Sequence, residues 1–325
     1  MPPQTDSSHP ARLSVSDLSV TYGRHKALKN LSLDIKSGEL VGVIGPNGAG
    51  KTTFIKALCG RVRSNGVIKI DNKPIKKGQD RRKTIGLVPQ DIGLYSQLTV
   101  NENLDVISRL LGLSKVKRKN GIDTALTAVS MQDKKHALVQ DLSGGMKRRI
   151  NVAAAIMYDP SVVIFDEPTA GVDIPARDTV HRLAQELASQ GKAVILITHE
   201  LEQAEALCDK ILLLVDGEAR AFSAPAEILM SEFKEDRAVR VRFASPPSLE
   251  TIAALRPFEF KQSELSTIWE AMTQANEVSF VSAFITSLKN GDNLVREITV
   301  RRPGLNALMH RVKSEQKMVK LKVAP

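Results

Sequence analysis

The chain begins with a stretch in which apolar and polar positions alternate, over residues 12–37. A period of two places successive side chains on opposite faces of a strand, so this stretch predicts antiparallel strands. From residue 40 onward the pattern changes to short, continuous apolar runs. Such runs are typical of parallel strands buried on both faces, and they lie at Leu40–Ile44, Ile85–Val88, Val162–Phe165, Ala193–Thr198 and Lys210–Val215.

Helical periodicity replaces the strands between Gln90 and Pro160. The apolar spacing there predicts helices over Val100–Leu111, Gly121–Val129 and Ser143–Tyr158. The simplest architecture that fits both patterns is an α/β core interrupted by a helical insert.

A change of composition near residues 224–236 separates this core from a smaller C-terminal part. Pro225 opens a short helix, and alternating strand patterns follow at Ala238–Phe243 and Leu294–Val300. Helical patterns lie at Ser279–Leu288 and Gly304–Val312, and this part contains no catalytic constellation. We therefore predict a polar tail over residues 1–11, a core domain over 12–235 with its helical part at about 90–160, and an α+β domain over 236–325.

Composition narrows the class of protein. A chain of 325 residues is long enough for about two domains, and its hydrophobic share of 42% is ordinary for a globular protein. No apolar run approaches the ~18 residues that a membrane-spanning helix needs, and the polar N-terminus does not resemble a signal peptide. Cys59 and Cys208 lack metal-ligand spacing, so we expect reduced packing cysteines in a cytosolic protein.

The net charge of +10 is spread along the chain, with dense basic runs at residues 81–83, 115–119 and 147–149. Such a balance suits nucleic acid or an anionic membrane surface, and it equally fits solvated faces of a globular protein. Aromatic residues make up only 4% of the chain and do not interleave with the basic runs. Nucleic-acid binding is therefore not expected.

The most specific motif lies directly behind the first buried strand. Residues 45–52 read Gly-Pro-Asn-Gly-Ala-Gly-Lys-Thr, between a strand-like run and a helix-like run. Glycines let the backbone curl so that successive N–H groups face one anion, and the following helix adds its positive dipole end. Lys51 then reaches the β- and γ-phosphates, and the Thr52 hydroxyl can ligate Mg²⁺. The motif predicts a phosphate site that comprises Gly45, Pro46, Asn47, Gly48, Ala49, Gly50, Lys51, Thr52 and Thr53.

Two more core strands end in chemically active side chains. Asp166 and Glu167 follow the apolar run 162–165; Asp166 would lie beside the Mg²⁺ shell, and Glu167 would orient and deprotonate the attacking water. His199 follows the run 194–198 and can hydrogen-bond the γ-phosphate or the water. Carboxylates at a strand end can also cap a turn, and a single histidine is usually structural. The expected neighbouring strands favour the catalytic interpretation.

Three further features complete the constellation. Gln90 ends a strand and opens the helical insert, so it can contact Mg²⁺ or water while signalling outward. Residues 142–146 read Leu-Ser-Gly-Gly-Met and open a helix, in which Ser143 is a good N-cap and the glycines let phosphate approach the backbone. Tyr22 lies at a strand end ahead of the phosphate loop, where its ring can stack on adenine.

Together these motifs resemble those of the nucleotide-binding subunit of an ABC transporter. They cover residues 12–222 in the family's order and spacing: the phosphate loop, the Gln90 loop, the signature Leu142–Met146, the Asp166 strand, the loop Ala170–Asp173 and His199. Met146 departs from the commoner Gln at its signature position. Met there, with the stretch Asp91–Leu104, resembles the exporter branch that handles drugs, polysaccharides and lipids. The C-terminal domain resembles the small accessory domain of some of those subunits.

The resemblance implies a P-loop NTPase core with an antiparallel β subdomain and a helical insert, and an ATPase that uses Mg²⁺. Two such subunits, most simply two copies of this chain, would clamp two ATP molecules between them. In one subunit the catalytic residues would be Lys51, Gln90, Glu167 and His199, and the metal ligands Thr52, Gln90 and Asp166. The other subunit would face the same ATP with Ser143, Gly144 and Gly145.

The resemblance also implies a separate membrane subunit. Gln90 and the helical insert would pass movement to its helices, so this chain would dock peripherally at the cytoplasmic face of the cell inner membrane. We expect the main contact in the region Gln90–Leu111. Four apolar residues there belong to no clean strand or helix and suit a groove for a short helix, namely Ile92, Leu94, Tyr95 and Leu98. The alternative is that they simply cover the insert.

Two other classes of protein share part of this pattern. A soluble ABC ATPase that acts on ribosomes or DNA usually carries two cassettes in one chain or a long coiled coil, and neither is present in this sequence. A module that binds ATP without turnover is disfavoured because Glu167 is intact. The motifs do not reveal a transported substrate, because specificity lies in the membrane subunit.

Overall fold

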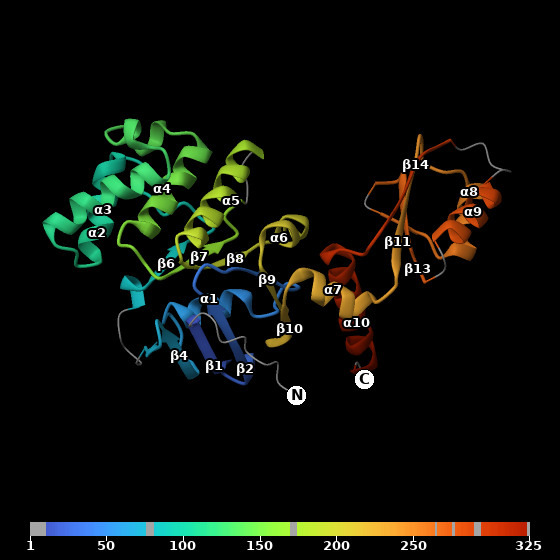
Figure 1. Ribbon diagram of the computed structural model, residues 1–325, viewed down its shortest axis with the longest axis horizontal. Coiled ribbons are helices and arrows are strands. Elements are labelled where there is room, and N and C mark those ends of the chain that lie inside the picture. Colours follow the sequence, from blue (N-terminus) through green and yellow to red (C-terminus); the bar gives the residue numbers. More distant parts are fainter. Residues whose placement is uncertain are drawn as a thin grey trace. The chain divides into compact units, whose positions relative to one another are not determined.

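The computed structural model describes residues 11–75, 81–169, 174–263, 265–274, 277–288 and 294–323 (Figure 1). The chain forms two compact units, which divide between Pro225 and Ala226. The sequence places this boundary after residue 235, whereas the structure assigns the helix that opens at Pro225 to the second unit. The phosphate loop, Gln90, the signature and the Asp166 strand all belong to the first unit.

An antiparallel sheet forms the start of the first unit, as the alternating pattern predicts. Its order is β2-β1-β4-β5, and its strands are β1 (Ala11–Tyr22), β2 (His25–Lys36), β4 (Asn65–Ile70) and β5 (Lys73–Pro74). Alternate apolar side chains of β1 are buried, at most 2% exposed, and these are Leu13, Val15, Leu18 and Val20. Sequence patterning alone did not reveal β4 and β5, which are short and mostly exposed.

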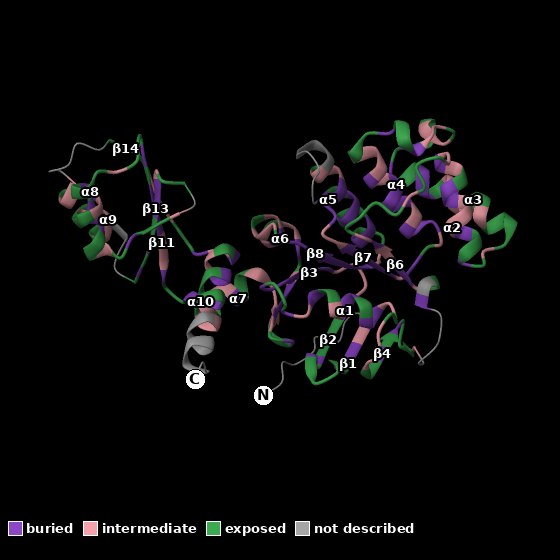
Figure 2. Cartoon of the chain, turned by 180° about the vertical axis from the view of Figure 1, so that it is seen from behind, coloured by how far each residue is buried: buried purple, intermediate pink, exposed green. Residues whose placement is uncertain are grey.

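A six-stranded sheet forms the centre of this unit, in the order β10-β9-β3-β8-β7-β6. All neighbours are parallel except the pair of β10 and β9. The strands are β3 (Leu40–Ile44), β6 (Ile85–Val88), β7 (Val162–Asp166), β8 (Ala193–Ile197), β9 (Lys210–Val215) and β10 (Glu218–Ser223). Every residue of β3 and β8 is buried (Figure 2), so the continuous apolar runs are confirmed as central strands.

Helices α1 (Lys51–Leu58), α5 (Ile174–Ser189) and α6 (Leu201–Leu207) follow strands of the central sheet. The two sheets and α1 share one hydrophobic core, in which Leu18, Phe54 and Ile195 are each at most 1% exposed. Throughout the described ranges, no helix combines the length and the apolar character needed to cross a membrane.

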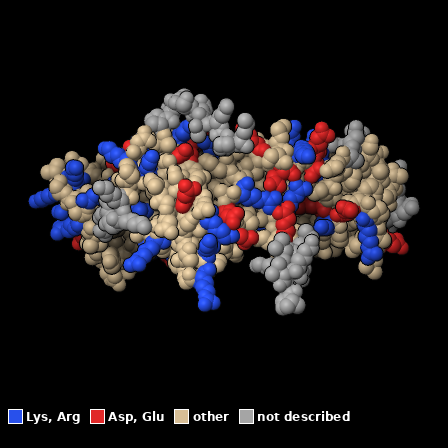
Figure 3. Space-filling model, turned by 90° about the horizontal axis from the view of Figure 1, so that it is seen from below, with Lys and Arg blue, Asp and Glu red and all other residues tan. Residues whose placement is uncertain are grey.

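The helical insert consists of α2 (Val100–Leu110), α3 (Lys115–Ala128) and α4 (Gly144–Ile156). Helix α3 begins ahead of the predicted start at Gly121, because the Ser114 side chain caps it by accepting from the Lys117 N–H. Glycine is required at position 121 inside α3, because a Cβ there would lie 2.1 Å from the Met157 carbonyl oxygen. Basic side chains are prominent on this part of the surface (left in Figure 3).

Short 3₁₀ turns punctuate the chain at Arg81–Lys83, Gln132–Lys134, Val139–Asp141 and Arg256–Phe258.

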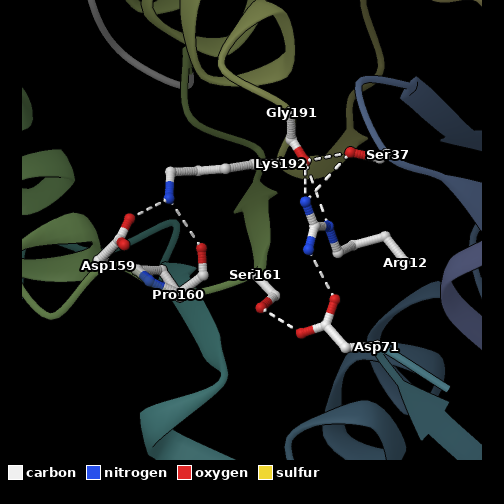
Figure 4. A network of polar contacts seen from close by, with 8 residues as sticks. All are labelled: Arg12, Ser37, Asp71, Asp159, Pro160, Ser161, Gly191 and Lys192. Carbon is white, nitrogen blue, oxygen red and sulfur yellow. Dashed lines mark hydrogen bonds and ion pairs between the residues drawn. The ribbon is translucent and has the colours of Figure 1, made fainter.

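A polar network ties the antiparallel sheet to the amino ends of β7 and β8 (Figure 4). Arg12 donates to the Gly191 carbonyl at 2.9 Å and pairs with Asp71 at 2.7 Å. Ser161 donates to the other Asp71 oxygen at 2.7 Å. Burial alone would raise the pKa of Asp71, but these hydrogen bonds and the Arg12 charge hold it below its ordinary value. The network fixes the edge of the central sheet that lies opposite the motifs.

The second unit contains an antiparallel sheet in the order β12-β13-β11-β14. Its strands are β11 (Arg237–Phe243), β12 (Lys261–Gln262), β13 (Ile268–Thr273) and β14 (Val295–Arg301), with helices α8 (Leu249–Leu255) and α9 (Glu277–Leu288) between them. This order of elements is the ferredoxin-like β-α-β-β-α-β arrangement. Val241, Trp269 and Phe284 lie in its core, each at most 8% exposed. The unit has the predicted α+β character and adds α8.

Helices α7 (Pro225–Phe233) and α10 (Leu305–Val323) complete the second unit. Arg311 of α10 lies 4.7 Å from the centre of the Phe233 ring, donates to the Glu232 carbonyl and lies 3.7 Å from an Asp236 oxygen. These contacts explain why α7 belongs with the C-terminal part of the chain.

Candidate functional site

The predicted motifs gather at one edge of the central sheet. Strands β3, β8, β7 and β6 are adjacent and parallel, so their carboxyl ends lie on the same side. Gly45 follows β3, Glu167 follows β7, His199 follows β8 and Gln90 follows β6. In open sheets of this kind, ligands bind beyond the carboxyl ends of the strands.

The phosphate loop is shaped by contacts within its own chain. Gly45 has φ +156°, and a Cβ there would lie 2.2 Å from the Leu214 carbonyl oxygen. Gly50 has φ +106°, and a Cβ there would lie 2.7 Å from the Ala27 carbonyl oxygen. Glycine is therefore required at both positions, and the backbone they allow leads directly into α1. The N–H groups at the start of α1 face the place where an anion is expected.

Lys51 is the first residue of α1 and is only 8% exposed. Its ammonium donates to the Gly45 carbonyl at 2.6 Å and to the Pro46 carbonyl at 3.2 Å. A lysine held by the carbonyls of its own phosphate loop is a compact charge already positioned at the anion site. The predicted role of Lys51 toward the β- and γ-phosphates is consistent with this position.

Asp166 and Glu167 have different surroundings although they are neighbours. Burial raises the pKa of Asp166, the Glu167 charge acts in the same direction, and the Lys51 charge opposes both. Glu167 adopts a left-handed backbone with φ +47°, which is uncommon outside glycine and concentrates at functional sites. Its N–H donates to the Ile197 carbonyl at 3.0 Å, which anchors it to the end of β8.

The closest contact between two predicted catalytic side chains is that of Glu167 with His199. Glu167 Oε1 lies 2.7 Å from His199 Nε2. The Glu167 side chain is 24% exposed and the His199 side chain 54% exposed, so the pair opens to solvent where a substrate water could enter. Sequence reasoning expected these residues on neighbouring strands, and the structure places them in direct contact.

The donor set fits a magnesium ion. Mg²⁺ prefers hard oxygen ligands and keeps several waters, so one or two carboxylates with substrate phosphates suffice. Asp166 offers a carboxylate, Thr52 a hydroxyl and Gln90 an amide oxygen, and a bound cation would relieve the cost of ionising the half-buried Asp166. Among the described residues, no group of three or more His, Cys, Asp or Glu side chains forms a dedicated metal cage.

The signature differs from the phosphate loop in its exposure. Ser143 caps α4, and its side chain accepts from the Met146 N–H at 3.3 Å. Ser143 and Gly144 are exposed, and a Cβ on Gly144 would meet no atom within 4 Å. The N–H groups at the start of α4 are thus open toward solvent. Residues Ala170–Asp173, the remaining loop of the resemblance, lie outside the described residues.

A shallow hollow of about 340 Å³ adjoins the phosphate loop at Gly48. Its other lining residues come from the β1–β2 turn, the first half of β2 and the β9–β10 turn, and are Arg24, His25, Lys26, Ala27, Lys29, Asp216 and Gly217. Tyr22 is 46% exposed and is not among the residues that line it. Adenine stacking on Tyr22 remains a prediction, and the basic turn behind Tyr22 is a feature that sequence reasoning passed over.

A partly buried polar cluster behind His199 is a second feature that sequence reasoning missed. Glu200 Oε1 accepts from Thr169 Oγ1 at 3.0 Å and lies 3.3 Å from Arg177 Nε. Glu200 Oε2 lies 3.9 Å from His181 Nε2, and neither of these two atoms has a hydrogen-bond partner. Burial lowers the pKa of His181, and the Arg177 charge acts in the same direction. The cluster joins the segments that follow Glu167 and His199. In the sequence, the signal for it is that Thr169 and Glu200 closely follow these two residues.

Arg148 is a third feature that sequence reasoning missed. It belongs to the basic run 147–149, which the sequence predicts to be solvated, yet it is only 2% exposed. Its guanidinium donates to the carbonyls of Pro89, Gln90 and Glu167. The exposed Gln90 is therefore fixed through its backbone rather than through its side chain.

Comparison with known proteins identifies the family to which this site belongs. Residues 28–170 match the family model described as ABC transporter. The chain is 38% identical over 213 residues to Nod factor export ATP-binding protein I of Burkholderia orbicola (strain AU 1054), an alignment that covers 65% of this chain and 70% of the relative. It is 36% identical over 218 residues to Linearmycin resistance ATP-binding protein LnrL of Bacillus subtilis (strain 168), covering 66% of this chain and 70% of the relative.

A solved structure has the same fold over a similar share of the chain. It is cbiO1 from Clostridium perfringens, described as part of the ABC transporter complex cbiONQ, with a TM-score of 0.62 and 28% sequence identity. The match covers 68% of this chain and 92% of the other. By sequence, fold and the order of its motifs, the chain belongs to the ABC transporter family as an ATP-binding subunit, and the domain of that family hydrolyses ATP.

Proposed function

We propose that this chain powers an ABC exporter by closing as a dimer on ATP and opening after hydrolysis, while it is docked on a separate membrane subunit. The observation that carries the proposal is the Glu167–His199 contact of 2.7 Å at the sheet edge that also holds the phosphate loop. The names of the two relatives concern export and resistance, which supports outward transport. The chain would act at the cytoplasmic face of the inner membrane.

Within one subunit, each residue has a distinct task. Lys51 and the start of α1 bind the phosphates, and the ammonium exchanges the Gly45 and Pro46 carbonyls for phosphate oxygens. Thr52, Asp166 and Gln90 hold Mg²⁺, which neutralises charge on the phosphates when it is bound. Glu167 orients the water and accepts its proton, and its carboxylate lies at the carboxyl edge of the sheet, 2.7 Å from His199. His199 supports the γ-phosphate or the water.

The second subunit supplies what one chain leaves open. Phosphoryl transfer depends mainly on positioning and electrostatics, so every oriented donor around the γ-phosphate counts. Ser143 and Gly144 are exposed at the start of α4, and Gly145 beside them is half-buried. The first N–H groups of a helix have no partner within the helix itself. Placed against the ATP of a partner copy, these N–H groups and the α4 dipole would complete the site. Hydrolysis then requires two subunits, whereas ATP binding requires one.

The segment after Gln90 is suited to receive the membrane subunit. Ile92 is 41% exposed and Tyr95 56% exposed. Asn103 is fully buried and fixes the loop: its Oδ1 accepts from the Tyr95 N–H at 2.7 Å and its Nδ2 donates to the Tyr95 carbonyl at 3.0 Å. A rigid loop with exposed apolar side chains, directly behind the Gln90 metal contact, offers a docking face for a short apolar helix.

The test combines hydrolysis with docking. Purified protein should hydrolyse ATP only with Mg²⁺, and it should co-purify with its membrane subunit when the two are produced together. Changing Ile92 and Tyr95 together to Asp should abolish co-purification and leave the affinity for ATP unchanged. Val67→Asp is the control, because Val67 is comparably exposed, at 46%, on β4. Retained co-purification of the double variant would place the docking surface elsewhere; no Mg²⁺-dependent hydrolysis would refute the proposal as a whole.

A further inference from the structure

The buried arginine of the signature helix joins three parts of the site. Arg148 Nη1 donates to the Pro89 carbonyl at 2.7 Å, and Nη2 donates to the Gln90 carbonyl at 2.9 Å and to the Glu167 carbonyl at 3.3 Å. Arg148 lies on α4, Pro89 and Gln90 follow β6, and Glu167 follows β7. One guanidinium therefore holds the backbone of a predicted metal ligand and that of the predicted base.

A second side chain on the same helix extends this grip. Asn151 is 4% exposed, and its Nδ2 donates to the Asp91 carbonyl at 3.2 Å. Arg148 and Asn151 are three residues apart, so they lie on one face of α4. Together they hold three consecutive carbonyls, those of Pro89, Gln90 and Asp91. The Gln90 loop is thereby bound to α4 along its backbone.

Glu167 is held at both of its peptide groups. Its N–H donates to Ile197 at the end of β8, and its carbonyl accepts from Arg148. Between these two contacts the residue keeps a left-handed backbone with φ +47°. A residue in that region relaxes unless its surroundings fix it. The Arg148 contact is thus one of the two that hold the Glu167 backbone, from which the carboxylate reaches His199.

The start of α4 carries Ser143, five positions ahead of Arg148 along a rigid helix. We propose that Arg148 is a positioning residue, which sets the orientation of Glu167 and of the Gln90 loop according to the position of α4. When a partner subunit engages Ser143, the helix would bring both residues into register in the same step. This inference rests on the proposed function and assigns to Arg148 the coupling of partner engagement to hydrolysis.

The structure offers a matched control in Arg81. It is also a buried arginine, 9% exposed, and its guanidinium also donates to backbone carbonyls, those of Ala57 and Leu58. Those carbonyls end α1 rather than flank a catalytic residue. Burial lowers the pKa of both arginines. Arg81 variants therefore report the cost of removing a buried guanidinium without moving Glu167 or Gln90.

The experiment compares Arg148→Met and Arg148→Lys with Arg81→Met and Arg81→Lys in the full chain. Turnover at saturating Mg-ATP, the dissociation constant for ATP and the unfolding midpoint are measured for each. We expect Arg148→Met to lower turnover about tenfold or more, the cost of a misplaced catalytic group, and to change ATP affinity less than about threefold. Arg148→Lys should recover part of the loss, since an ammonium still donates to some of these carbonyls. Arg81→Met should lower the unfolding midpoint and leave turnover per folded molecule near that of the wild type.

Two additional arms keep the result decisive. Asn151→Ala removes the neighbouring grip without exposing a buried charge and should lower turnover in the same direction, more weakly. If Arg148→Met does not fold, Arg148→Lys and Asn151→Ala carry the test. Turnover of the Arg148 variants equal to that of the stability-matched Arg81 variants would overturn the inference while leaving the proposed function intact. Absence of hydrolysis in the wild type would instead refute the proposed function.

Discussion

The phosphate loop and the signature are both glycine-containing turns that open a helix, yet the chain treats them in opposite ways. In the phosphate loop, a Cβ on Gly45 would collide with the Leu214 carbonyl at 2.2 Å, and Lys51 is bound to the loop's own carbonyls. In the signature, a Cβ on Gly144 would meet nothing, and Ser143 is exposed. The first turn is shaped by contacts within its own chain, whereas the second is exposed, and we propose that it serves a group of a partner subunit.

This difference suggests that the two turns bind phosphate in different settings: the phosphate loop within one chain, and the start of α4 across two subunits. Everything needed to recognise a phosphate is internal: the glycine-shaped turn, the start of α1 and a positioned ammonium. The start of α4 offers a second set of N–H groups at an exposed turn, where the Ser143 side chain accepts from the Met146 N–H. Variants of the first group should therefore act within a monomer, and variants of the second should act only when two subunits meet.

The largest effect is expected at Glu167. Glu167→Gln should retain ATP binding and lose turnover by about a hundredfold or more, the scale of removing a general base. The reason is the Glu167 position after β7, in contact with His199 at 2.7 Å. Steady-state hydrolysis and equilibrium binding of ATP measure the two quantities. Glu186→Gln, an exposed carboxylate on α5, is the control, and near-normal turnover of Glu167→Gln would exclude it as the base.

Next in size is the loss of ATP-driven dimerisation at Ser143. In the Glu167→Gln background, ATP should shift the protein from monomer to dimer in sedimentation velocity, and Ser143→Arg should abolish that shift. A bulky cation at the start of α4 would block the γ-phosphate of the partner. Ser114→Arg is the matched control, since Ser114 caps α3 in the same way but belongs to no motif. Equal dimer fractions for both arginine variants would remove the distinction between the two turns.

The side chains that gather at the carboxyl edge of the central sheet could be predicted from sequence because the physics is local. A buried parallel strand followed by a polar residue puts that residue at the carboxyl edge of the sheet, which is how Gln90, Glu167 and His199 were identified together. What remained hidden depends on packing. Arg148 lies in a basic run that looks solvated, and only the packing of α4 against the loops after β6 and β7 shows that it is buried.

Element boundaries failed where a local preference was overridden by a tertiary contact. The apolar spacing predicts the start of α3 at Gly121, a residue that disfavours a helix interior on propensity alone. The Met157 carbonyl lies so close that only glycine fits, and the helix extends through it to Lys115. In the same way, α7 appears continuous with the first unit in sequence, but Arg311 binds it to α10 from far along the chain.

A smaller effect is expected on stability, when alanine replaces a glycine of the phosphate loop or of the signature. Gly45→Ala should lower the free energy of unfolding by about 1–3 kcal/mol, because its Cβ overpacks against Leu214. Gly144→Ala should leave that free energy within about 0.5 kcal/mol of the wild type, as for an unstrained exposed site. Denaturant unfolding of the ATP-free protein measures both. A Gly144→Ala variant as unstable as Gly45→Ala would mean that the signature is also shaped from within.

The smallest expected effect is on the pH dependence of stability. It tests whether the cluster of Thr169, Arg177, His181 and Glu200 supports the segments that follow Glu167 and His199. Burial lowers the pKa of His181, so the folded protein binds its proton less readily than the unfolded chain does. The contribution of neutral His181 to the free energy of unfolding is fully present above its unfolded pKa of about 6.5. It is lost as the pH falls below that value toward the lower pKa of the folded protein. Charged groups around it are Glu200 and Asp178, which favour the proton, and Arg177, which opposes it.

The unfolding midpoint of the wild type should therefore fall by a few degrees more between pH 7.5 and pH 5.5 than that of His181→Gln, both pH values being chosen to bracket about 6.5. His136→Gln, which removes an exposed histidine of the helical insert, is the control. If His181→Gln keeps the full pH dependence, the buried pair of His181 and Glu200 does not stabilise the segments behind Glu167 and His199. The contacts that support Glu167 would then be those of its backbone with Arg148 and Ile197.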